Sequence, residues 1–329
     1  MVVGLIGAGI IAGVHLANLR QIAGVEIAAV CDVDAGRAEH FAREYNARAY
    51  ADADEMFDRE SLDALFVCVP PFARGNIVEK AVERGIHVYL EKPVAIDLDT
   101  AARTAAAVER SNAMVGVGYM WRYAAHVERA KQLLNPDGKN LILARMLNSP
   151  PGSAWSFDKR LSGGILVEFA THLFDAVRYI GGEIVEVSGA GAEVVPGQPE
   201  RGIDSAVLSL RFANGSIGSF ATSWAYPGSL WDINITTPIG QLTLNFSPDR
   251  LHGNVRGEYI EINGEMPPAA AGFGGAGWHL AVNYFVRAVR TGDKSLIRSP
   301  FTDAARTLAV ALACDEAVMS NKTTSVIEI

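Results

Sequence analysis

Two separate segments of the chain carry residues suited to proton transfer. Glu91-Lys92-Pro93 follows a short apolar run, and Glu168 and His172 follow the double glycine Gly163-Gly164. A lysine can donate a hydrogen bond to an oxygen that gains negative charge, and a histidine, which titrates near neutral pH, can take a proton from a hydroxyl. If 165–179 is one helix, Glu168 and His172 share a face and can form a polarised pair. We therefore expect Lys92, Glu168 and His172 to be catalytic.

A glycine-rich turn near the start of the chain predicts a dinucleotide site. The segment Gly7-Ala8-Gly9-Ile10-Ile11-Ala12 is a G-x-G-x-x-A turn directly after an apolar run. Gly7 permits a tight turn, Gly9 lets the backbone approach a pyrophosphate, and the following helix N-terminus favours an anion. Asp32 stands twenty residues later, where a carboxylate binds ribose hydroxyls and repels a 2′-phosphate, so NAD is expected rather than NADP. Arg37 either contacts the cofactor or is a solvent-exposed arginine on a helix.

Alternating apolar and amphipathic stretches predict the elements that position these residues. Residues 1–119 are expected to form a doubly wound α/β domain of the Rossmann type. Its strands are expected at Val2–Ile6, Glu26–Cys31, Asp63–Val69, His87–Leu90 and Met114–Gly118, and its helices at Asp34–Tyr45, Phe72–Arg84 and Asp97–Arg110. Ligands bind at the carboxyl ends of such strands, so Val69, Pro70, Glu91 and Lys92 are expected beside the cofactor.

The second half of the chain, residues 120–329, has a different pattern. Long β-rich runs over about 185–262, with turn signals at Ala213-Asn214-Gly215 and Pro227-Gly228, predict a large, mainly antiparallel sheet in an α+β domain that binds substrate. Helices expected at Ala124–Leu134, Ile165–Tyr179, Trp278–Arg290 and Phe301–Met319 would cover one face. Apolar residues alternate in Ser205–Phe212 and Ser216–Trp224, so we expect a second subunit on the open face, in a homodimer or homotetramer. Pro267–Gly277 is either a surface connector or a lid.

The composition limits the partners. A net charge of −8 and a pI of about 5.4 argue against a nucleic-acid surface, and no apolar stretch is long enough to span a membrane. Three widely spaced cysteines indicate neither a disulfide framework nor a metal cluster, which favours a cytoplasmic protein. His172 and Asp175 are close on a helix but have no obvious third ligand, so no metal site is expected.

Together these segments resemble the Gfo/Idh/MocA family of NAD(P)-dependent oxidoreductases over almost the whole chain. The likeness rests on the glycine turn followed by His15, the E-K-P tripeptide, the double glycine with its carboxylate and histidine, and Gly118-Tyr119-Met120-Trp121-Arg122-Tyr123 at the domain junction. The resemblance implies a cis bond before Pro93, a sugar-like substrate, and proton transfer and substrate binding by Lys92, Glu168 and His172. It also implies an oligomer formed through the open sheet.

Several residues depart from the family pattern or allow two interpretations. Glu168 stands where the family usually has aspartate, and Arg74 where many members have histidine; Arg74 contacts the cofactor or is exposed on a helix face. Arg122, with Asp175 as a further substrate candidate, holds a substrate group or forms an ion pair at the domain junction. Trp155, together with Phe157, forms a stacking wall for a sugar ring or packs in the core.

Three functions are compatible with these residues. The favoured one is reversible hydride transfer between nicotinamide and a secondary alcohol or ketone of a sugar, polyol or related molecule. A redox-neutral glycosidase or lyase could instead keep its NAD and oxidise the sugar only transiently. A non-catalytic NAD-binding sensor is the third, and the presence of both Lys92 and His172 counts against it.

Overall fold

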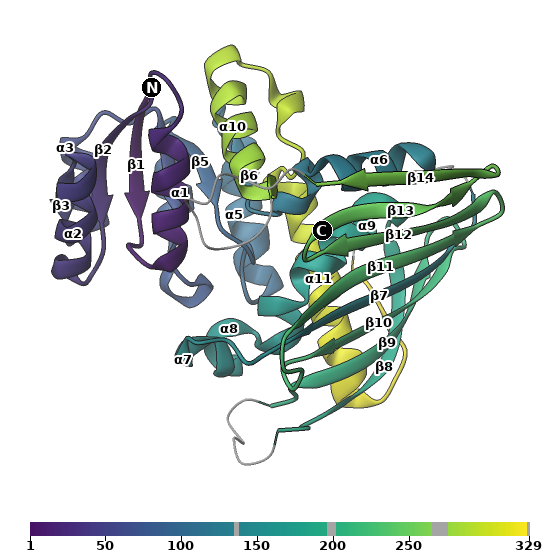
Figure 1. The fold of residues 1–329 in the computed structure, drawn as a ribbon. Helices are drawn as coiled ribbons and strands as arrows, with labels where there is room; N and C mark the ends of the chain where they lie inside the picture. Colours follow the sequence, from purple (N-terminus) through teal and green to yellow (C-terminus); the bar gives the residue numbers. More distant parts are fainter. Residues whose placement is uncertain (135–137, 196–201, 265–275, 328–329) are drawn as a thin grey trace.

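The computed structural model describes residues 1–134, 138–195, 202–264 and 276–327. Within these ranges the chain forms two sheets, the first with helices on both faces and the second with helices on one face (Figure 1). The expected segment Pro267–Gly277 lies almost wholly outside the described residues. No helix of the described chain is long and apolar enough to cross a membrane.

The first sheet has six parallel strands in the order β3-β2-β1-β4-β5-β6, which is the predicted doubly wound arrangement. Its strands are nearly continuous in buried residues because helices cover both faces. The bounds are β1 (Val2–Ile6), β2 (Glu26–Cys31), β3 (Arg48–Tyr50), β4 (Ala64–Val67), β5 (His87–Leu90) and β6 (Val115–Val117). The helices are α1 (Ile10–Arg20), α2 (Ala35–Tyr45), α3 (Ala53–Arg59), α4 (Ile77–Glu83) and α5 (Leu98–Arg110).

Helix starts in this half are set by local chemistry. Asp34, Asp52 and Asp97 each accept hydrogen bonds from backbone N–H groups at the starts of α2, α3 and α5. The single helix expected over Phe72–Arg84 is wrong. Gly75 has a φ of +51°, which interrupts the run, so a short 3₁₀ turn, η1 (Pro71–Ala73), precedes α4. Short, polar β3 and α3 lacked the apolar pattern that would have predicted them.

The second sheet has nine strands in the order β14-β13-β12-β11-β7-β10-β9-β8-β15 and is mainly antiparallel, as predicted. The strands are β7 (Leu141–Asn148), β8 (Ile184–Ala192), β9 (Ser205–Phe212), β10 (Ile217–Ser223), β11 (Ser229–Thr237), β12 (Gly240–Phe246), β13 (Asp249–Val255), β14 (Glu258–Asn263) and β15 (Thr324–Ser325). The one parallel pair among these is β7 with β10. The turn at Pro227-Gly228 therefore joins two strands on either side of β7, which the sequence pattern did not predict.

Three helices cover one face of this sheet: α6 (Ala125–Leu133), α9 (Thr171–Gly181) and α11 (Phe301–Ser320) (Figure 1). The expectation that Trp278–Arg290 would join them is wrong. That segment lies in α10 (Ala276–Thr291), which packs on α1 and on the turn η2 (Met120–Tyr123). The apolar face of α10 explains this, because the Phe285 ring lies 5.7 Å and 5.5 Å from the rings of Phe66 and Tyr89 in the first sheet.

Candidate active site

The glycine turn has the shape that a pyrophosphate requires. Gly7 has a φ of +96°, and a Cβ there would lie 2.7 Å from the backbone nitrogen of Val69, so only glycine fits. A Cβ on Gly9 would meet nothing within 4 Å, and α1 starts at Ile10 without a side-chain cap. The unpaired N–H groups and the positive end of α1 therefore face open space beside Gly9. Ile10, which is 77% exposed, and half-buried Ile11 flank this turn.

Asp32 ties the glycine turn to the end of β2. Its Oδ2 accepts a hydrogen bond of 2.6 Å from the backbone N–H of Ala8, and its Oδ1 accepts one of 2.8 Å from that of Asp34. The next residue, Val33, is 95% exposed, which leaves an apolar side chain open beside the carboxylate. Arg37 is largely exposed and its Nε lies 3.3 Å from Oδ2 of Asp34. These features fit a dinucleotide with a free ribose 2′-hydroxyl, and a contact from Arg37 to it stays a prediction.

The side chain of Glu91 supports the glycine turn through His15, and a contact from Glu91 to the cofactor stays a prediction. Its carboxylate is buried, and Oε1 lies 2.7 Å from Nε2 of His15, itself fully buried in α1. A Cβ on Gly118 would lie 2.9 Å from the same oxygen, so this glycine makes room for the carboxylate. Because it is paired and enclosed, the Glu91 side chain holds α1 against β5.

Lys92 projects from the end of β5 toward the second half of the chain. The bond between Lys92 and Pro93 is cis, as the resemblance implied. Its Nζ donates to the backbone carbonyl of Glu168 at 2.9 Å and to Oε1 of the same residue at 3.2 Å. The two side chains are only 15% and 14% exposed. An ammonium has three donors, so one N–H remains for a substrate oxygen.

His172 stands at the start of α9 among aromatic rings. Its imidazole lies 5.6 Å from the ring of Trp121 and 6.3 Å from that of Tyr119. The Tyr119 hydroxyl in turn hydrogen-bonds that of Thr171 at 2.7 Å. Burial and the nearby positive charge of Lys92 hold the pKa of His172 well below its usual value. The imidazole is therefore neutral at neutral pH and able to accept a proton.

The expected pairing of Glu168 with His172 is wrong. Residues Ile165–Phe169 form a wide π-type turn, closed by a 2.8 Å bond from the Ala170 N–H to the Ile165 carbonyl, and α9 begins only at Thr171. Glu168 thus lies in the π turn and His172 in the α-helix that follows, so the two residues do not belong to one regular helix and their spacing does not place them side by side. Glu168 pairs with Lys92 instead, and Nδ1 of His172 is buried without a hydrogen-bond partner in the described chain.

Arg122 and Asp175 form a buried ion pair, which corrects their assignment to the substrate. Arg122 donates to both carboxylate oxygens of Asp175, at 2.8 Å and 2.6 Å, and also pairs with Asp303. Arg122 and Asp175 are 4% and 1% exposed. Arg178 and Thr307 extend this network between α9 and α11. Of the two interpretations, the ion pair at the junction is the one that the structure shows.

Arg74 is neither exposed nor directed at the glycine turn. Its guanidinium is buried and donates to backbone carbonyls that follow β4 and β5, including those of Val69 and Glu91. The interpretation of Arg74 as exposed on a helix face is therefore wrong, and a contact from Arg74 to the cofactor stays a prediction. Arg74 stands alone among small and apolar residues, so no sequence motif indicates that it binds backbone carbonyls at the strand ends.

The two aromatic residues before the double glycine have different surroundings. Phe157 packs against the core, with its ring 5.4 Å from that of Trp224. Trp155 is half-buried, and its ring lies 6.2 Å from the half-exposed ring of Phe72, which belongs to the first half of the chain. A substrate contact by Trp155 stays a prediction.

The sequence pattern missed Trp231 on β11, which brings a half-buried ring to 6.0 Å from Trp121 and 6.4 Å from Phe169. No motif surrounds Trp231, so only the strand order could have placed it there.

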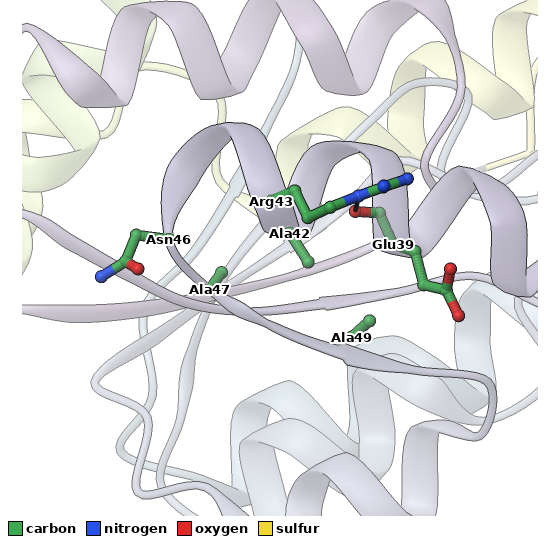
Figure 2. A pocket seen from close by; sticks show the side chains of 6 residues that line it. All are labelled: Glu39, Ala42, Arg43, Asn46, Ala47 and Ala49. Atoms are coloured by element: carbon green, nitrogen blue, oxygen red, sulfur yellow. Dashed lines mark hydrogen bonds between the residues drawn. The ribbon is translucent and has the colours of Figure 1, made fainter.

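Other features of the described chain lie apart from this site. Within the described ranges, no three His, Cys, Asp or Glu side chains gather as metal ligands. A surface hollow of about 450 Å³ lies between α2 and β3 and is lined by Glu39, Ala42, Arg43, Asn46, Ala47 and Ala49 (Figure 2). It stands at the outer edge of the first sheet, whereas Lys92 follows β5 on the other side of β1.

Comparison with known proteins agrees with this geometry. Residues 1–119 match the family model "Oxidoreductase family, NAD-binding Rossmann fold", and residues 141–242 match "GFO/IDH/MocA C-terminal domain". The chain belongs to the Gfo/Idh/MocA family of oxidoreductases. Residues 1–119 thus form an NAD-binding Rossmann domain, and NAD is its cofactor, as the turn and Asp32 predicted.

Relatives of this family member include dehydrogenases. "Uncharacterized oxidoreductase YrbE" of Bacillus subtilis is 32% identical over 66% of this chain, and the match spans 65% of that protein. "Myo-inositol 2-dehydrogenase" of Thermotoga maritima is 28% identical over 66% of this chain and 67% of its own. The fold matches levoglucosan dehydrogenase in complex with NADH and levoglucosan with a TM-score of 0.86, at 20% identity and over 100% of both chains.

Proposed function

We propose that this protein is an NAD(H)-dependent dehydrogenase that acts on a secondary alcohol or ketone of an uncharged sugar, polyol or related molecule. The observation that carries the proposal is the meeting of Lys92, from the end of β5, with Glu168 and His172 from the second half of the chain. The names of its relatives, an inositol dehydrogenase and a levoglucosan dehydrogenase, support a hydroxylated ring as substrate.

The cofactor would be held by residues of the first domain. Gly7 to Ala12 would hold the pyrophosphate, Asp32 the adenosine ribose, and the strand end at Val69 and Pro70 would border the nicotinamide. When bound, NAD⁺ supplies the acceptor for the hydride that leaves the alcohol carbon. NADP(H) is disfavoured because its 2′-phosphate would meet the Asp32 carboxylate.

Lys92 and His172 would have different roles at the substrate hydroxyl. The free N–H of Lys92 donates to the substrate oxygen and so stabilises the negative charge that develops there. The neutral imidazole of His172 takes the hydroxyl proton, and the same two residues act in reverse on a ketone. Glu168 binds Lys92 through two oxygens and so keeps its ammonium directed at the site.

The charges of the site favour an uncharged substrate. The cationic side chains around it have partners: Lys92 with Glu168, Arg122 with Asp175, and Arg74 with backbone carbonyls. A phosphate or carboxylate on the substrate would need a free arginine or lysine to bind it. A hydroxylated ring needs only neutral donors and acceptors and an aromatic surface, which Trp231 offers.

A screen of polyols and aldoses with NAD⁺ tests this function. We expect the absorbance of reduced nicotinamide to rise in step with the oxidised product for at least one neutral compound. Product without any change in absorbance would instead establish a redox-neutral reaction. Binding of NADH without turnover of any compound would favour a sensor.

We further propose that the open face of the second sheet is covered by a second copy of the chain. Leu141 and Leu143 on β7, Val207 on β9 and Ile217 on β10 are 39–62% exposed and lie on the face opposite the helices. Sedimentation velocity at micromolar concentration should show a dimer or tetramer. Leu143→Glu should produce monomers, whereas a monomeric wild-type protein would refute the proposal.

A further inference from the structure

Arg74 has an unusual set of partners for a buried arginine. Its side chain is nearly inaccessible, yet its hydrogen bonds within the described chain go to neutral backbone carbonyls. Nε donates to Val69 at 3.2 Å, Nη2 to Glu91 at 2.6 Å, and Nη1 to Pro93. The carbonyl of Lys92 lies 3.5 Å from Nη2. A single guanidinium therefore gathers the carbonyls on both sides of Lys92.

These carbonyls belong to two neighbouring strand ends. Val69 follows β4, residues 91–93 follow β5, and the two strands are adjacent and parallel in the first sheet. Carbonyl oxygens directed at one point repel one another unless a donor stands between them. The planar fork of an arginine sets both the distance and the orientation of its acceptors, which a lysine cannot do.

We propose that Arg74 is a positioning residue for Lys92, an inference that rests on the proposed function of the site. Because the carbonyls of Glu91 and Pro93 are held, the backbone at Lys92 cannot rotate. Its Nζ thus stays within reach of Glu168 and of the substrate oxygen. A shift of about 1 Å in such a group can cost on the order of 100-fold in rate.

The charge of Arg74 is compatible with this role. Burial lowers the pKa of its guanidinium to about 10, and the negative charge of Glu91 acts in the opposite direction. Arg74 therefore stays charged at neutral pH and its bonds to carbonyls are charge-assisted.

A neighbouring pocket gives access to Arg74 and supplies a control residue. It has a volume of about 260 Å³, lies between η1, α4 and α5, and is lined by Arg74, Phe72, Val94 and Arg103, among others. Arg103 is largely exposed, and its Nε lies 3.3 Å from Oε1 of Glu79 rather than near a carbonyl of the Lys92 segment. Arg103→Ala therefore removes an arginine from the same pocket without releasing Lys92.

The first test compares Arg74→Ala, Arg74→Lys and Arg103→Ala in the full-length protein. We expect kcat to fall by about 10- to 100-fold in both Arg74 variants, while the Kd for NADH changes by less than about threefold. Arg103→Ala should stay within about twofold of wild type. Added methylguanidinium, which the pocket can admit, should restore part of the rate of Arg74→Ala but none in the double variant with Lys92→Met.

The second test needs no turnover. Limited acetylation followed by peptide mass spectrometry measures the reactivity of Lys92 directly, with exposed Lys322 as the internal reference. We expect Lys92 to react several-fold faster in Arg74→Ala and Arg74→Lys than in wild type or Arg103→Ala, because its Nζ is released from Glu168.

The outcomes separate this inference from the proposed function. If Arg74 variants lose only thermal stability or NADH affinity, with kcat and Lys92 reactivity unchanged, Arg74 is not a positioning residue. If wild type transfers no hydride with any polyol or sugar, the proposed function fails, and the acetylation rates still decide whether Arg74 holds Lys92. Arg74→Lys keeps the positive charge, so both tests can be made with this variant if Arg74→Ala does not fold.

Discussion

Replacing Glu168 with glutamine should slow hydride transfer because the substitution disturbs Lys92. It should not act by disturbing His172. The carboxylate of Glu168 lies 3.2 Å from the Lys92 ammonium. By contrast, Nδ1 of His172 has no hydrogen-bond partner in the described chain. Glutamine keeps the size of the side chain and one oxygen acceptor, and the backbone carbonyl that Lys92 also binds is unchanged. The substitution therefore removes one charge and little else.

The contact geometry sets the expected size of the effect. In an effective dielectric of about 20, two unit charges 3.2 Å apart attract by about 5 kcal/mol. Because the carbonyl bond and a neutral acceptor remain, the net loss should be nearer the ~1.5–3 kcal/mol of hydrogen bonds to charged groups. This corresponds to a fall of roughly 10- to 150-fold in kcat/KM.

A double-mutant cycle separates the two partners. Steady-state rates are measured for Glu168→Gln alone, in a Lys92→Met background and in a His172→Gln background. We expect Glu168→Gln to cost less than about threefold once Lys92 is absent, and its full factor when only His172 is absent. Glu186→Gln, which changes an exposed carboxylate on β8, is the control and should leave the rate unchanged. A loss that persists without Lys92 and vanishes without His172 would refute the assignment.

Three further predictions concern the chemistry, the cofactor and stability. Lys92→Met and His172→Gln should each lower kcat by at least ~100-fold, because positioned acid–base groups contribute ~10²–10⁴-fold to the rate. The Kd for NADH should stay within about threefold of the wild-type value. Near-normal turnover in either variant would exclude that residue from the proton-transfer mechanism. Calorimetry should show NAD(H) binding at least ~tenfold more tightly than NADP(H), and Asp32→Asn should narrow the difference. His126 is a fully buried residue of α6, and this burial lowers its pKa to about 4. The side chain therefore stays neutral in the folded state, whereas in the unfolded chain it takes up a proton below about pH 6.5. Its contribution to stability is therefore lost as pH falls, by about 2 kcal/mol between pH 7.5 and pH 5, and chemical denaturation should show a flatter pH dependence for His126→Leu; parallel curves for the two proteins would contradict this.

Much of the first domain follows from local sequence. Residues next to one another in the chain determine the buried strands, the aspartate helix caps and the glycine turn. These features can therefore be predicted from the sequence alone. The same holds for the positions of Lys92 and His172, because short motifs mark both. Strand β7 and the packing position of helix α10 escaped prediction for the opposite reason, since their neighbours lie far away in the chain.

Partner choice was decided only by the tertiary structure. The sequence alone identified Lys92, Glu168, Arg122 and Asp175 as charged residues expected at the site, but not which of them meet. A buried charge pairs with whichever opposite charge or carbonyl the packing brings within about 3 Å, because burial without such a partner costs far more than any local preference. The π-type turn moved Glu168 away from His172 and onto Lys92, and the packing of α11 enclosed Arg122 with Asp175. Sequence spacing assumes a regular helix, and only the packed chain shows where that regularity is broken.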